Sequence, residues 1–75
     1  MSVKQLGLSY LFYKALADKE AARLSMSLLL DNPAGIGDHS TGDFYANLDE
    51  ALNKLVDAED RLGILKSAFG KVEGE

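Results

Sequence analysis

Residues 31–43 of this 75-residue chain read DNPAGIGDHSTGD, and they interrupt a pattern that is otherwise helical on both sides. Proline disfavours the α conformation of the residue before it, and its ring blocks continuation of a helix. A helix that reaches this segment must therefore end close to Pro33. Three glycines add the backbone freedom that a reversal of the chain needs. We predict a hinge over residues 32–42 between two arms of nearly equal length.

The composition is that of one small globular domain, residues 1–75. The apolar share is 47%, which is too high for a disordered chain. The sequence contains no cysteine, so a disulfide framework, a thiolate zinc site and a thiol nucleophile are excluded.

The net charge of −4 is unevenly distributed between the arms. Residues 1–30 carry four basic and two acidic side chains, whereas residues 44–75 carry four basic and seven acidic ones. Neither arm offers the clustered Lys and Arg that phosphate neutralisation requires, so we expect no nucleic-acid partner. No apolar run approaches the roughly 20 residues of a membrane span. We therefore expect no membrane partner and a cytoplasmic location.

The first arm is apolar around most of its circumference. Ser2 and Gln5 have the spacing of a capping box, which predicts a helix over residues 3–31. One apolar stripe follows at helical spacing: Val3, Leu6, Tyr10, Tyr13, Ala17, Ala21, Leu24 and Leu28. A second apolar stripe lies roughly 140° from the first around the helix axis. Its members are Leu8, Leu11, Ala15, Ala22, Met26 and Leu29.

The second arm carries the most regular pattern in the chain. Its apolar residues alternate steps of four and three: Phe44, Leu48, Ala51, Leu55, Ala58, Leu62, Leu65, Phe69 and Val72. This is a heptad seam, and it predicts a helix over residues 43–70 that packs along one line. Glu50–Lys54 and Asp57–Arg61 have the spacing of i,i+4 ion pairs on the exposed side. Residues 71–75 form a tail that we expect to fray.

The hinge contains the residue types of several active sites without their spacing. Asp38, His39 and Ser40 are adjacent, so their side chains point in different directions, unlike a hydrolytic triad. The hinge aspartates do not follow the calcium-loop pattern, whose twelfth residue should be glutamate but is Gly42 here. We therefore predict no catalytic, cofactor-binding or metal-binding residue. A metal-binding or enzymatic role centred on residues 31–43 is the least favoured alternative.

The hinge also carries a resemblance. Residues 32–39, NPAGIGDH, set between two helices in so short a chain, resemble small uncharacterised helical-hairpin proteins encoded by T4-like tailed phages. The resemblance implies a helical hairpin and a viral source, hence the host cytoplasm, and it implies no activity.

Together these patterns predict an all-α fold, an antiparallel two-helix hairpin. A single seam buries too little apolar surface to offset the entropy of ordering two long helices, so we expect a homodimer that forms a four-helix bundle. We expect the first stripe of the first arm to face the second arm. The second stripe would then form the interface between copies: Leu8, Leu11, Ala15, Ala22, Met26 and Leu29.

The expected function is that of a non-catalytic structural or protein–protein interaction module that self-associates. The alternative is a regulatory or inhibitory protein whose first helix docks into a groove of a host or viral partner.

Overall fold

A computed structural model describes residues 2–31 and 41–70 of the chain. The predicted helix stop at Pro33, the residues Asp38 and His39 for which no site is predicted, and the fraying of residues 71–75 lie outside these described residues.

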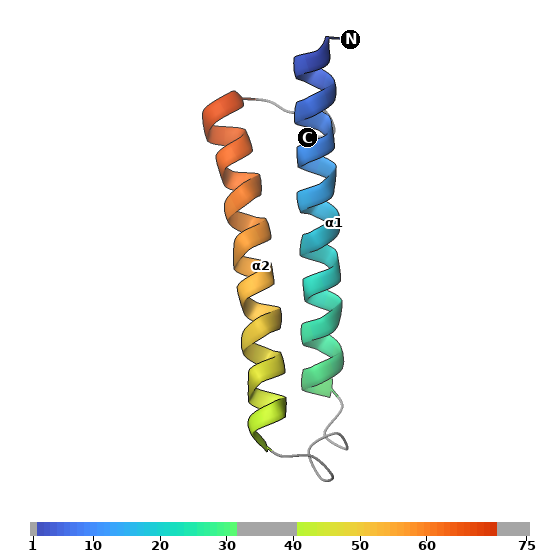
Figure 1. The fold of residues 1–75 in the computed structure, drawn as a ribbon, viewed down its shortest axis with the longest axis vertical. Coiled ribbons are helices and arrows are strands. Elements are labelled where there is room, and N and C mark those ends of the chain that lie inside the picture. The colour runs from blue at the N-terminus through green and yellow to red at the C-terminus, as the bar shows by residue number, and fades with distance from the viewer. Residues whose placement is uncertain (1, 32–40, 71–75) are drawn as a thin grey trace.

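The described residues form two helices that pack side by side. Helix α1 spans Val3–Asp31 and helix α2 spans Thr41–Phe69, and no strand occurs in the described part of the chain. The helices run in opposite directions, as Figure 1 shows, and the molecule measures 52 × 16 × 16 Å. The prediction of an all-α hairpin is confirmed. The bounds of α1 coincide with the predicted range, whereas α2 begins two residues before the predicted start.

Side chains and backbone cap two of the helix ends as the sequence indicates. The backbone N–H of Gln5 donates to Ser2 Oγ at 3.1 Å, and Ser2 N–H donates back to Gln5 Oε1 at 3.1 Å. This is the reciprocal capping box. At the end of α2, Gly70 adopts φ 74° and its N–H donates to the carbonyl of Lys66 at 3.0 Å. Glycine takes this left-handed conformation without the steric cost that a Cβ brings, so it ends α2 cleanly.

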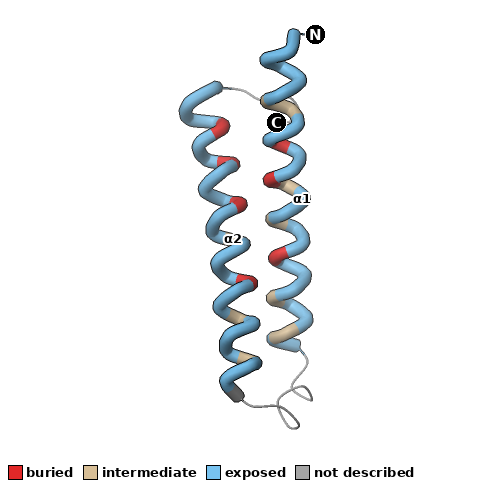
Figure 2. Tube along the Cα trace, in the orientation of Figure 1, coloured by how far each residue is buried: buried red, intermediate tan, exposed pale blue. Residues whose placement is uncertain are grey.

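The two helices meet along one line of small and apolar side chains. The α2 side is the predicted heptad seam, in which every member from Phe44 to Leu65 is buried or half-buried, whereas Phe69 is exposed. The α1 side has the same alternation of four and three: Leu8, Phe12, Ala15, Lys19, Ala22, Met26 and Leu29. Buried positions lie on the facing sides of the two helices in Figure 2. Phe12 and Ala15 of α1 pack with Leu62 and Leu65 of α2 in one hydrophobic cluster.

The face of α1 that packs on α2 is the opposite of the predicted one. We predicted that the first stripe, which includes Tyr10 and Leu24, faces α2, and this is wrong because those side chains are exposed. Two helices stay in register along their length only when both apolar rows share a period. The α1 seam repeats every 3.5 residues as α2 does, whereas the first stripe contains two consecutive steps of four and drifts away from that line.

One charged side chain sits within the seam. Lys19 occupies a central seam position of α1, where it is half-buried, and its Nζ lies 3.5 Å from Glu59 Oε1 of α2. Among the ion pairs of the described residues, this is the one that joins the two helices. A charged residue at one seam position favours a single register, at some cost in stability. The predicted pairs within α2 are confirmed, Glu50–Lys54 at 3.0 Å and Asp57–Arg61 at 3.1 Å.

Alanines set how closely the helices approach. Ala58 is 1% exposed, so Ala58→Leu must push α1 away from α2, and we expect it to lower the free energy of unfolding by about 1–3 kcal/mol. Ala46→Leu, on the exposed side of α2, is the matched control and should change it by less than about 0.5 kcal/mol. Urea unfolding followed by circular dichroism measures both values. An equal loss of unfolding free energy in the two variants would contradict the placement of Ala58 between the helices.

Replacing the seam lysine tests the cost of its charge. We expect Lys19→Leu to raise the free energy of unfolding by about 1 kcal/mol, because leucine buries apolar surface where the ammonium group stays at the edge. Glu59→Gln removes the ion pair alone and should cost less than about 1 kcal/mol, since both partners are reached by solvent. A marked destabilisation by Lys19→Leu in thermal melts would show that the ion pair, and not the apolar seam, holds the helices together.

Candidate interaction surface

The side of α1 that points away from α2 is a continuous apolar strip, which we call the outer face. Tyr10, Leu24 and Leu28 are 63%, 61% and 61% exposed, and the remaining members are exposed as well. The outer face consists of Val3, Leu6, Tyr10, Tyr13, Ala17, Ala21, Leu24 and Leu28. It runs nearly the full length of α1 and contains no charged residue.

The outer face lies opposite the seam, at positions that a two-helix hairpin normally gives to polar side chains. Helix α2 follows that normal pattern, because Asp49, Asn53, Asp57 and Asp60 occupy its corresponding positions and are exposed. Some apolar side chains of α2 are also exposed, including Tyr45 and Ile64. Asp49, Asn53, Asp57 and Asp60 lie among them, so they form no strip along the whole length of α2. The two helices therefore have outer surfaces of opposite character.

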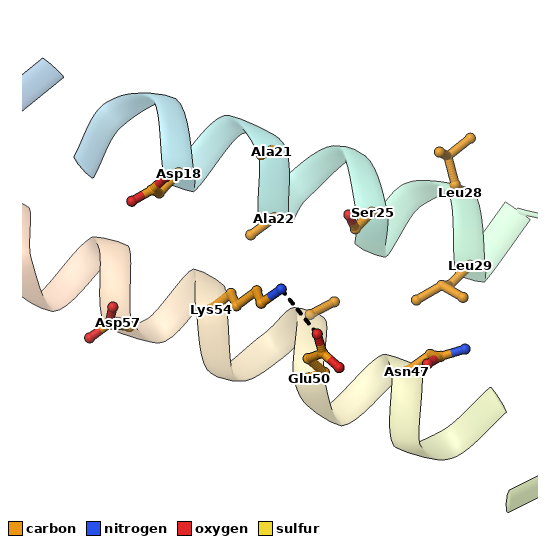
Figure 3. A pocket seen from close by; sticks show the side chains of 11 residues that line it. Asp18, Ala21, Ala22, Ser25, Leu28, Leu29, Asn47, Glu50, Lys54 and Asp57 are labelled. Carbon is orange, nitrogen blue, oxygen red and sulfur yellow. Dashed lines mark ion pairs between the residues drawn. The ribbon is translucent and has the colours of Figure 1, made fainter. Parts of the chain in front are cut away.

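Neighbouring residues near the end of α1 show the division between its two faces. In Figure 3 the side chain of Leu29 points toward α2, whereas that of Leu28 points away from it. Ala22 also faces α2, across a shallow open groove that reaches Ala51 and is bordered by the Glu50–Lys54 ion pair. The groove exists because small side chains line its floor.

Charged pairs border the outer face on both sides. Lys14 Nζ binds Asp18 Oδ2 at 2.9 Å, and Arg23 Nη1 lies 3.2 Å from Glu20 Oε2. The hydrogen bond and the negative charge of Asp18 raise the pKa of Lys14 above 10.5, so Lys14 is cationic at neutral pH. An apolar strip between rows of exposed charges has the composition of an interface core with its polar rim.

Two features of other kinds of site can be assessed among the residues that the structure describes. No polar or charged side chain there is buried, and no three His, Cys, Asp or Glu side chains come together as metal ligands would. Neither helix, over its described residues, is both long enough and apolar enough to cross a bilayer. The exposed apolar strip is the feature that distinguishes this surface.

The six residues predicted to form the interface between copies mostly pack inside the hairpin instead. Ala15 and Ala22 are buried in the seam, and Leu8, Met26 and Leu29 are half-buried there. Leu11 is 45% exposed and lines a second groove beside Ile64 of α2. The surface left outside the hairpin is therefore the outer face, which we had predicted to be covered by α2. A search of α1 for the four-and-three spacing of α2 identifies the seam only when one charged residue, Lys19, is accepted at a seam position.

Comparison with protein-family models, with curated proteins and with solved structures finds no match to this chain.

Proposed function

We propose that this chain is a non-catalytic protein–protein interaction module, and that the outer face of α1 binds the same face of a second copy. The observation that carries the proposal is the exposure of eight consecutive strip positions without a charge among them. The phage origin implied by the hinge would place this module in the cytoplasm of the host.

The size of the outer face supports an interface. At roughly 100 Å² of accessible apolar surface for each of its six large side chains, the strip offers on the order of 600 Å². That is the upper end of what monomers expose and approaches the roughly 800 Å² that each partner contributes to a standard interface. A self-complementary patch also serves both chains of a two-fold dimer at once.

The composition of the seam supplies a second argument. Among the residues that the structure describes, four of the seven buried apolar ones are alanines, namely Ala15, Ala22, Ala51 and Ala58. Alanines bring the helices close but bury little apolar surface, so the bulkier side chains of α1 are left outside. Covering them with a second copy would provide the burial that a hairpin of this size lacks.

The proposed dimer contains four helices, with the two α1 helices central and the two α2 helices outside. This order follows because the outer face lies opposite the seam. The four helices then lie in one row, whereas in the four-helix bundle expected from the sequence they pack around a common core.

Sedimentation across a hundredfold range of concentration tests the proposal. We expect the 8.1 kDa chain to sediment as a dimer. We expect Leu24→Asp to be a monomer, because dimerisation would bury its unpaired carboxylate in the interface. Asn53→Asp adds the same charge on the exposed side of α2 and should leave the dimer intact.

Circular dichroism on the same samples separates loss of the dimer from loss of the hairpin. A Leu24→Asp monomer that keeps its helix content has a stable hairpin, and one that unfolds depends on the dimer; both support the proposal. A wild-type chain that stays monomeric throughout would contradict it and favour a regulatory protein whose α1 docks onto a different partner.

A further inference from the structure

The outer face of α1 has the same spacing in both directions along the helix. From Leu6 to Leu28 the strip advances by steps of 4, 3, 4, 4, 3 and 4, which is a palindrome centred on Ala17. A helix that runs antiparallel to α1 presents its residues in reverse order. A palindromic strip therefore meets an antiparallel copy of itself with every member opposite another member.

The side-chain sizes along the strip favour the antiparallel pairing. With Ala17 opposite itself, Tyr13 lies opposite Ala21 of the second copy, so a large side chain meets a small one. The pairs Tyr10–Leu24 and Leu6–Leu28 have similar combined bulk. In a parallel pairing each residue would meet its own counterpart, which places two tyrosine layers beside two alanine layers and forces the helices apart at one end. The antiparallel arrangement spreads the small residues more evenly, because two alanines then meet only at the Ala17 layer on the two-fold axis.

The charges at the ends of α1 favour the same orientation. Helix α1 has no acidic residue in its first turn and no basic residue in its last turn, and it ends at Asp31. A negative charge is unfavourable at the C-terminus of its own helix and favourable at an N-terminus. Antiparallel pairing about Ala17 places Asp31 level with Val3 of the second copy, beside the first turn of that helix.

We propose, building on the proposed self-association, that the second copy lies antiparallel, with the two-fold axis passing through Ala17. The two α1 helices then pack along Leu6–Leu28, and the two α2 helices flank them. The orientation is a separate claim from association, because a dimer could also form with α1 helices parallel.

Distances between spin labels test the orientation. The chain has no cysteine, so Ser27→Cys and Glu20→Cys each introduce one label site per chain, both at positions beside the outer face and outside the seam. In the antiparallel dimer the two Ser27 sites are 20 residues apart along the axis, about 30 Å at 1.5 Å per residue. The two Glu20 sites are six residues apart, about 9 Å along the axis before the width of the helices is added.

The parallel dimer gives a different pattern, since every site then lies level with its counterpart. Labels at both positions would be separated by similar short distances, and that result, on a protein that sediments as a dimer, would overturn the orientation while leaving self-association in place. A wild-type chain that sediments only as a monomer would instead overturn the proposed function, and the orientation with it.

A double-mutant cycle provides a second, independent readout. We expect Ala21→Tyr to weaken the dimer at least tenfold in Kd, because it places tyrosine opposite Tyr13 of the other chain. Adding Tyr13→Ala should restore most of the affinity, since the two positions then exchange sizes. In a parallel dimer these positions lie about 12 Å apart along the axis and their effects would simply add. Neither side chain belongs to the seam, so hairpin stability serves as the internal control.

Discussion

Two straight rows of side chains stay in contact over many helical turns only when their repeats match, and this requirement governs the hairpin. The α2 row advances 3.5 residues per contact, so α1 must present a row with the same period. The row of α1 that packs on α2 has this period, and it contains Lys19 together with Ala15 and Ala22. The matching of periods therefore outweighs the bulk and hydrophobicity of the competing stripe.

The alanine-rich seam leaves the bulkier apolar side chains of α1 outside the hairpin. A seam rich in alanine holds two helices close together while burying little of each, and the tyrosines and several leucines of α1 remain in contact with solvent. The helix is thus apolar on two opposite sides, one covered within the chain and one not. A helix with this pattern is typical of the interior of an assembly, where it has neighbours on both sides.

Much of the fold can be predicted from local sequence, whereas the face of α1 that stays exposed cannot. The capping box at Ser2, the glycine after α2 and the unbroken heptads of α2 are short-range signals that act within one or two turns, so they predict helices reliably. The face that α1 turns toward α2 depends on a comparison between distant segments. Lys19 made the seam of α1 difficult to recognise in the sequence, because a charged residue is not expected in an apolar row. Its apolar stem packs at the seam edge while its ammonium group reaches Glu59.

The contrast between the two outer surfaces of the hairpin also limits how far assembly can proceed. Chains that are adhesive on two opposite sides polymerise, since each added subunit exposes a fresh attachment point. Here one edge is apolar and the other carries Asp49, Asp57 and Asp60, whose like charges repel a second acidic edge. Once two apolar edges have met, the particle is bounded on both sides by carboxylates. The proposed dimer would therefore stop at two copies, and growth into filaments would require neutralising the acidic edge of α2.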